Sequence, residues 1–455
     1  MKMRHLNFLA ILSLMLITFA CNGEDPFEPL LTVSLETEKL VFSNQGGSQD
    51  FELESNELWT VGEVPEWILV KVKDMDVATR GTTYAAGKKN VTVVVEPNPG
   101  FKTRTANILL SSASGKKMQL TVKQEKSPEL VGYWILSEGS FGSNNSELAW
   151  YDVAKGELSV KQFEKINGVK LGDTGNDLEI YGSKMYCVVT GPGTGAGGQE
   201  GTNYIEVINP ADGKSIKRIP FTDAQGNPAK PRFIVFEEGK GYVSSYSNEL
   251  VRLDTATLTL DAHATLSGTF AEELAICGKN IYVCNSGQGN DDKISVVDIK
   301  SMKEVKVITT EKNPTGIIAV DNERLFFNTS YPKYNVYSLD PKTEAIKQVE
   351  KIKGNTLTSV SGNIYLPYFD WGKYTGAVYI YNPQLQQSSK LLLDYESVGI
   401  MMLMEYKVGT INGSEDIFLS GQGQDMLIID PFTKSIKYSF QTKVPCPSGV
   451  VAYYR

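Results

Sequence analysis

The chain has 455 residues, which is long for one ordinary domain, so we expect two. A hydrophobic content of 41% is ample for a packed core, while a formal net charge of −8 without a basic block argues against nucleic-acid binding, which needs clustered Lys and Arg. The only histidines are His5 and His263, which argues against multi-histidine zinc sites and a Ser-His-Asp triad, so we predict no metal, no cofactor and no enzymatic activity.

The first 20 residues have the layout of a secretion signal. A basic start precedes an apolar run from Leu6 to Ala20, which is shorter than the roughly 20 residues of a membrane-spanning helix. A small residue, Ala20, stands directly before Cys21, and this ending resembles the lipobox of bacterial lipoproteins. The resemblance implies cleavage before Cys21 and acylation of its thiol, which anchors the chain to a membrane by lipid alone. The alternative is a plain signal peptide with an incidental cysteine.

Residues 21–30 are expected to form a linker. Its acidic pair, Glu24-Asp25, resembles the surface-export signal of Bacteroidetes lipoproteins. That resemblance implies a location on the outer membrane, facing the cell exterior.

Residues 31–126 alternate apolar and polar residues in short runs, which predicts a small antiparallel β-sandwich. The segment resembles the BACON domain of Bacteroidetes surface proteins. The matching pieces are Leu40-Val41-Phe42-Ser43, Gly46-Gly47-Ser48, Leu58-Trp59-Thr60-Val61, Pro65-Glu66-Trp67-Ile68 and Leu120-Thr121-Val122-Lys123-Gln124. Trp59 and Trp67 are either sugar-stacking platforms or core anchors, and their apolar neighbours favour the core. The domain itself either binds carbohydrate or acts as a spacer.

Residues 131–455 repeat one pattern seven times: an apolar strand that ends in Asp or Asn and is followed by a polar turn. The copies end at Asp152, Asn209, Asp254, Asp298, Asp340, Asn382 and Asp430. Their spacing of 42 to 57 residues is typical of β-propeller blades. We therefore predict an all-β chain in which a β-sandwich is followed by a seven-bladed propeller.

The C-terminus predicts how this propeller closes. Pro447 to Val451 matches Pro314 to Ile318, a first strand, but no blade follows it. The repeat begins at Tyr133 to Leu136, a second strand with no first strand before it. We expect the C-terminal strand to complete the first blade, which leaves no unpaired edge.

The loops between second and third strands are the predicted binding face. They are long and rich in aromatic, amide and glycine residues, whereas the turns between first and second strands are tight. The best single cluster is Tyr368 to Trp371, because exposed aromatic rings on a loop commonly stack on a ligand. The alternative is that these rings fold back onto the blade edge. The predicted ligand-binding residues are Phe141, Asn144, Tyr246, Asn285, Tyr331, Tyr334, Tyr368, Phe369, Asp370, Trp371 and Gln422.

Other motifs carry less weight. Residues 193–198 fit G-x-G-x-x-G, but no helix is expected after them, so we predict a loop and not a dinucleotide site. Glu272 and Glu273 are adjacent on a predicted strand, where successive side chains face opposite sides. The cysteines other than Cys21 show no metal or disulfide framework, and Cys187 and Cys284 lie in apolar runs that predict burial.

Two family resemblances suggest a function. Tyr282-Val283-Cys284-Asn285 resembles the YVTN propeller repeat, and Glu138 to Asp152 resembles a Bacteroidetes lipoprotein propeller family of the DUF5074 type. That family includes surface proteins that capture corrinoids, relatives of vitamin B12, and pass them to a TonB-dependent outer-membrane transporter. The resemblance implies corrinoid capture and nutrient uptake. The alternatives are a glycan-binding surface protein of a polysaccharide-utilisation system and a propeller lyase or hydrolase.

Overall fold

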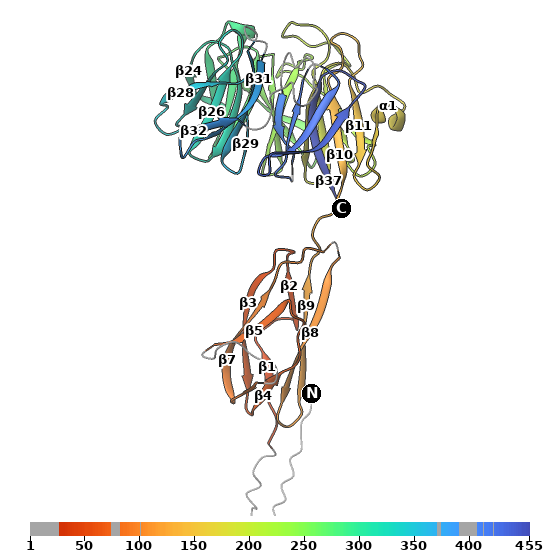
Figure 1. Cartoon of the computed structure of the whole chain (residues 1–455), viewed down its shortest axis with the longest axis vertical. Helices are drawn as coiled ribbons and strands as arrows, with labels where there is room; N and C mark the ends of the chain where they lie inside the picture. Colours follow the sequence, from red (N-terminus) through yellow and green to blue (C-terminus); the bar gives the residue numbers. More distant parts are fainter. Residues whose placement is uncertain are drawn as a thin grey trace, which may run out of the picture. The chain divides into compact units, whose positions relative to one another are not determined.

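The computed structural model describes residues 27–73, 82–100, 102–370, 375–390, 407–412, 414–421 and 423–455. The chain divides into two compact units, residues 1–129 and 130–455, and both consist mainly of strands (Figure 1). The predicted signal segment and Cys21 lie outside the described residues.

The N-terminal unit is formed by two sheets that share one core. One sheet contains, in spatial order, β1 (Leu31–Val33), β3 (Gly47–Ser55), β7 (Gly87–Val95) and β5 (Ile68–Val72). The other contains β2 (Lys39–Phe42), β9 (Lys117–Gln124), β8 (Arg104–Ser112), β4 (Trp59–Val61) and β6 (Thr83–Tyr84). The alternating apolar side chains predicted from the sequence meet between the sheets. One pair, β2 with β9, is parallel, whereas the sequence pattern predicts an antiparallel sandwich.

Both tryptophans of this unit belong to its packing. Trp59 is fully buried and stacks on Tyr84, with ring centroids 4.5 Å apart. Trp67 packs against the same core and carries the Arg104 guanidinium 4.2 Å from its ring centroid. The core interpretation is therefore confirmed for Trp59, which has no exposed surface for a sugar.

The C-terminal unit contains, among the described residues, seven antiparallel four-stranded sheets. In chain order their strands are β37 (Pro447–Tyr454), β10 (Leu130–Ser137), β11 (Glu147–Asp152) and β12 (Glu157–Ser159); β13 (Gly175–Tyr181), β14 (Lys184–Val189), β15 (Tyr204–Ile208) and β16 (Ser215–Pro220); β17 (Pro231–Glu237), β18 (Lys240–Ser245), β19 (Glu249–Asp254) and β20 (Thr259–Thr265); β21 (Ala271–Cys277), β22 (Asn280–Asn285), β23 (Lys293–Asp298) and β24 (Lys303–Thr309); β25 (Pro314–Asp321), β26 (Arg324–Thr329), β27 (Asn335–Leu339) and β28 (Ile346–Lys353); β29 (Thr358–Val360), β30 (Asn363–Asp370), β31 (Thr375–Asn382) and β32 (Gln387–Lys390); and β33 (Lys407–Thr410), β34 (Ile417–Ser420), β35 (Asp425–Asp430) and β36 (Ser435–Gln441). A short helix, α1 (Gln162–Asn167), follows the first sheet, and one 3-10 turn, η1 (Gly287–Gly289), lies in the fourth.

The seven sheets close into a ring. The first strand of each sheet contacts the first strand of the next, and β33 contacts β37. Each core cluster lies between two successive sheets, and the cluster that contains Tyr133 and Phe418 joins the seventh sheet to the first. The predicted C-terminal pairing is confirmed, because β37 pairs with β10 and places Val451 opposite Trp134. Every described first strand therefore has a neighbouring sheet on each side.

One predicted loop is in fact strand. Residues 367–370 continue β30 and pair with residues 375–378 of β31. The connection between these strands is therefore shorter than the sequence pattern suggests, and Phe369 packs against the neighbouring core.

Candidate functional site

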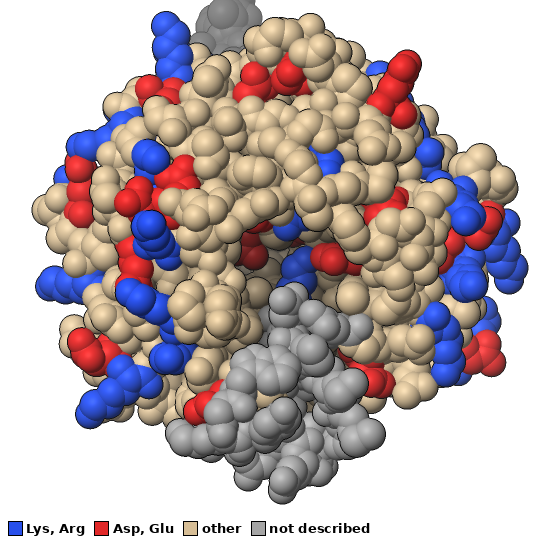
Figure 2. Space-filling view, turned by 90° about the horizontal axis from the view of Figure 1, so that it is seen from above, with Lys and Arg blue, Asp and Glu red and all other residues tan. Residues whose placement is uncertain are grey.

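A cavity of about 880 Å³ opens at the centre of the ring, at the end where first strands begin and second strands finish. Figure 2 shows this face of the unit, with a central hollow in which acidic and basic side chains are visible. The volume lies in the range of small-molecule sites, about 300–1,000 Å³. The loops between second and third strands that the sequence predicts as a binding face contribute Phe141, Tyr246, Tyr331 and Tyr334 to its lining.

A repeated β-bulge positions most of the polar lining. In five of the described first strands the register slips by one residue close to the strand start. In β21, for example, Ala271 pairs with Asn285 but Leu274 pairs with Val283, so two residues stand opposite Cys284 alone. The cavity-lining residues at these bulges are Asn176, Arg232, Phe233, Glu272, Glu273 and Thr315. A bulge bends a strand and redirects its side chains, and here it directs them to the ring centre.

This bulge corrects the interpretation of Glu272 and Glu273. Strict alternation predicts that their side chains face opposite sides of the sheet, but both line the cavity. The extra residue in β21 removes the alternation at this point.

Arg232 and Glu272 form the best-ordered charged group of the cavity. Arg232 Nη2 lies 3.2 Å from Glu272 Oε2, and the guanidinium carbon lies 4.7 Å from the centroid of the Tyr246 ring. The other oxygen of Glu272 accepts hydrogen bonds from the Tyr246 hydroxyl at 3.1 Å and from Ser286 Oγ at 3.2 Å. Burial alone would lower the pKa of Arg232, but the Glu272 carboxylate raises it, so the guanidinium stays charged. The pair is thus a fixed charge in the cavity wall.

Lys407 supplies the second cation. Its ammonium lies 3.6 Å from Glu138 Oε1 and donates a hydrogen bond to the main-chain oxygen of Asn176 at 3.0 Å. It also lies 5.6 Å from the centroid of the Phe233 ring, and the Arg232 guanidinium lies 5.4 Å from the same ring. One aromatic ring is therefore shared by both cations of the lining.

Three carboxyl groups at the ring centre titrate abnormally. Burial raises the pKa of Glu273 to about 7, with Asp177 adding to the rise and Lys407 opposing it. Burial also raises the pKa of Asp177, against the hydrogen bond from Ile234 N and the charge of Lys407. Burial and the neighbouring Asp177 raise the pKa of Glu179 well above its ordinary value. The ring centre therefore has too little positive charge to hold all three as carboxylates.

Aromatic rings stand at the cavity mouth. Phe141 is 61% exposed and Tyr331 is 72% exposed, although each lines the cavity. Tyr331 meets Tyr334 edge to face at 6.4 Å between ring centroids, and Tyr334 meets Tyr368 in the same way at 5.8 Å. These rings form a row along the fifth and sixth sheets.

The other predicted site residues lie elsewhere. Asn144 is exposed outside the cavity, and its main-chain N–H donates to Asp173. Phe369 and Asp370 are part of β30 and are not in the lining. Trp371 and Gln422 lie outside the described residues, so the structure does not place them.

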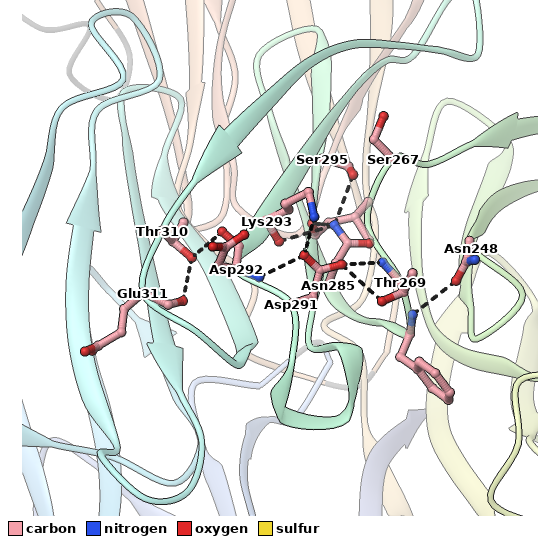
Figure 3. A network of polar contacts seen from close by, with 12 residues as sticks. Asn248, Ser267, Thr269, Asn285, Asp291, Asp292, Lys293, Ser295, Thr310 and Glu311 are labelled. Atoms are coloured by element: carbon pink, nitrogen blue, oxygen red, sulfur yellow. Dashed lines mark hydrogen bonds and ion pairs between the residues drawn. The ribbon is translucent and has the colours of Figure 1, made fainter.

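Asn285 is fully buried and does not reach the cavity. Its amide nitrogen donates to Ser295 Oγ at 3.0 Å and to the main-chain oxygen of Val283 at 3.1 Å. It belongs to a polar network next to the loop at η1 (Figure 3), where Asp291 accepts hydrogen bonds from Thr269 N at 2.7 Å and Lys293 Nζ at 2.7 Å. These contacts give both residues a structural role.

The glycine-rich segment, residues 191–201, is a loop, as predicted. It leads into β15 and not into a helix. Three side chains from other sheets donate to its main-chain oxygens: Lys230 Nζ to Gly193, Gln288 Nε2 to Thr194 and Ser247 Oγ to Ala196. The segment is thereby fastened across the third and fourth sheets.

The remaining titratable groups lie away from the cavity. His263 is on β20, the outermost strand of its sheet, and its Nδ1 is 3.1 Å from Glu249 Oε2. Cys187 and Cys284 are fully buried in strands, as the sequence predicts. In the described part of the chain, no helix is long and apolar enough to cross a bilayer.

The sequence did not single out Arg232, Glu272, Glu273 or Lys407 as binding residues. The available signal was their position: charged side chains near the start of strands that are otherwise apolar. Recognising the bulge would have required the register, which the sequence does not print.

Fold and site together define a two-unit β protein with a charged, aromatic-rimmed cavity at the centre of a ring of sheets. Residues 131–350 match the family model “Domain of unknown function (DUF5074)”, and residues 57–125 match the BACON model, described as “Putative binding domain, N-terminal”. The chain thus contains a BACON domain and a DUF5074 domain.

Comparison with solved structures gives distant similarities. Hydrazine synthase of Kuenenia stuttgartiensis is 15% identical, with a TM-score of 0.45 over 61% of this chain and 89% of that chain. The computationally designed Ika8 protein is 11% identical, with a TM-score of 0.46 over 72% and 96%. U3-55K is 9% identical, with a TM-score of 0.47 over 61% and 84%. A search of curated proteins found no match.

Proposed function

We propose that residues 131–455 form a seven-bladed β-propeller of the YVTN type and that the chain captures a ligand in the central cavity. Seven sheets with contacts between successive first strands support the propeller. The observation that carries the binding role is the cavity itself: about 880 Å³, with paired charges on its wall and exposed rings at its mouth. Such a combination of apolar surface and a few ordered polar groups is typical of small-molecule sites.

The ligand we propose is a corrinoid, and the chain would hand it to a TonB-dependent transporter in the outer membrane. Support comes from the match to the DUF5074 family and from the resemblance of that family to corrinoid-capturing surface proteins. A lipid anchor at Cys21 and a surface location belong to the same proposal. Binding, and not catalysis, fits the charged groups of the cavity, because Arg232 pairs with Glu272 and Lys407 with Glu138.

A glycan is the second candidate. The row formed by Tyr331, Tyr334 and Tyr368 favours it, because successive exposed rings can stack on successive sugars. The BACON match over residues 57–125 adds a family associated with binding.

Calorimetric titration of the full chain with cyanocobalamin tests the corrinoid proposal. We expect a dissociation constant of about 1 nM or tighter, which corresponds to about −12 kcal/mol. Tyr331→Ala and Phe141→Ala should each weaken binding by about tenfold or more, since buried aromatic anchors dominate such interfaces. Phe432→Ala is the matched control, because this ring is 54% exposed but lies at the β35–β36 turn, outside the cavity lining. Absence of heat at high micromolar cyanocobalamin would reject the corrinoid, and the same protein would then be screened against polysaccharides.

A further inference from the structure

The two cations that line the cavity already have partners, but one carboxyl group does not. Arg232 is 3.2 Å from Glu272, and Lys407 is 3.6 Å from Glu138. Among the described residues, no cation lies within ion-pair distance of Glu273, although Glu273 lines the same cavity. Its nearest like charge is Asp177, which raises its pKa further. Glu273 is therefore the under-compensated group of the lining.

A second acceptor on the same side also lacks a donor. Asn328 is fully buried, and its Nδ2 donates to the main-chain oxygens of Gly354 at 3.2 Å and Asn355 at 3.0 Å. These two bonds fix the orientation of the amide. Its Oδ1 receives no hydrogen bond from the described residues. A buried amide oxygen without a donor is rare in folded proteins and costs free energy.

Both acceptors converge on Gly316, which lines the cavity and pairs with Asn328 across the strands. A Cβ atom on Gly316 would lie 2.3 Å from Asn328 Oδ1 and 3.2 Å from Glu273 Oε2. The missing side chain therefore leaves two oxygens on either side of one point. We call Glu273, Gly316 and Asn328 the acceptor wall.

We propose that the cavity selects ligands that present a hydrogen-bond-donating nitrogen, a primary amide or an ammonium group, to the acceptor wall. The inference rests on the proposed ligand-capture function, because it names the chemistry of the ligand in that same cavity. A nitrogen donor supplies the hydrogen bonds that the wall lacks. An anionic oxygen at the same point would instead add a like charge beside Glu273 and Asp177.

The test compares cyanocobalamin with its monocarboxylate derivatives, in which one side-chain amide has become a carboxylate. Titrated into the full chain, at least one derivative should bind about tenfold or more weakly, the effect of losing a hydrogen bond to a charged group. Glu273→Gln should narrow that difference, because it removes the repelling charge while keeping the shape of the side chain. Glu157→Gln should leave the difference unchanged, since Glu157 is exposed on β12, outside the cavity lining.

The outcomes separate the inference from the proposed function. Tight cyanocobalamin binding, with every derivative equally tight or with the discrimination intact in Glu273→Gln, overturns the inference and leaves the corrinoid function standing. The comparison of ligands on the unaltered chain holds even if the variant does not fold.

Absence of cyanocobalamin binding removes the corrinoid proposal but not this test. The probes are then trimers of glucosamine and of galacturonic acid, which differ in carrying ammonium or carboxylate groups. Binding of the glucosamine trimer that is about tenfold tighter supports the inference. Equal binding, tighter binding of the acidic sugar, or binding of neither overturns it.

Discussion

The side-chain nitrogen of Gln288 donates a hydrogen bond to the main-chain oxygen of Thr194, 2.8 Å away, and so joins the fourth sheet to a loop of the second. Gln288 lies in η1, next to the polar network that Asp291 organises. The glycine-rich segment therefore depends on contacts from other sheets for its position, since its own residues contribute few side chains.

Gln288→Ala should loosen the glycine-rich segment without unfolding the ring. Hydrogen–deuterium exchange of residues 191–201 should become faster, while exchange in β14 and β15 stays unchanged. Gln348→Ala, an exposed residue of β28, is the control and should alter neither. Unchanged exchange in the Gln288 variant would mean that Lys230 and Ser247 suffice to hold the segment.

Gly316→Ala should destabilise the C-terminal unit by about 1–3 kcal/mol, the usual cost of forcing extra atoms into a packed site. The new methyl group would lie 2.3 Å from Asn328 Oδ1, too close for any real contact. Gly195→Ala is a matched control, because no atom lies within 4 Å of its added Cβ. Urea unfolding measures both variants, and equal stabilities would show that the wall can move.

Stability of the C-terminal unit should fall as the pH rises from 5 to 8. The pKa of Glu273 is about 7 in the folded chain against an ordinary value of 4.5, so the folded state binds more protons between these values. Its favourable contribution is complete below pH 4.5 and is lost as the pH passes 7, by about 1–3 kcal/mol.

Glu273→Gln should flatten part of this pH dependence. Some slope should remain, because burial also raises the pKa of Asp177 and Glu179. Urea unfolding at four pH values provides the measurement for the unaltered chain and the variant. A variant whose slope equals that of the unaltered chain contradicts the assignment of Glu273.

Trp134→Phe should cost about 1–3 kcal/mol of stability. The buried indole N–H of Trp134 donates to the main-chain oxygen of Pro210 at 2.8 Å, a bond between the first and second sheets. Phenylalanine leaves that oxygen without its donor. Trp150→Phe should cost less, since this half-buried neighbour, 4.9 Å away between ring centroids, has no described acceptor for its N–H. Thermal unfolding would rank the two, and the reverse order would contradict the role given to the bond.

The sequence predicted the repeat well because strand period and turn spacing are local properties. Pairing of Pro447–Val451 with Tyr133–Leu136 could be predicted because each lacked its counterpart in the repeat. Four aromatic residues of the cavity lining could be predicted from loop composition. The charged wall could not, because the bulges that direct Arg232, Glu272 and Glu273 inward depend on how one strand registers with the next.

Burial also divided the predicted residues in a way that composition does not reveal. Asn285 and Tyr331 both follow or end a second strand, yet Asn285 is fully buried and Tyr331 is 72% exposed. The difference arises from the network around Ser295, which takes up the Asn285 amide. Polar residues at equivalent repeat positions therefore serve packing in one sheet and line the cavity in another.

The pairing of β37 with β10 sets a limit on when the binding site can exist. Ser448 Oγ donates to the main-chain oxygen of Gly175 at 2.9 Å, a contact that spans 273 residues. Residues 445–447 also form part of the cavity lining. During translation the first sheet must therefore wait, with the edge of β10 unpaired, until the last residues of the chain have left the ribosome. A chain interrupted shortly before its end would lose the site and carry an open edge, which makes incomplete copies both inactive and prone to aggregate.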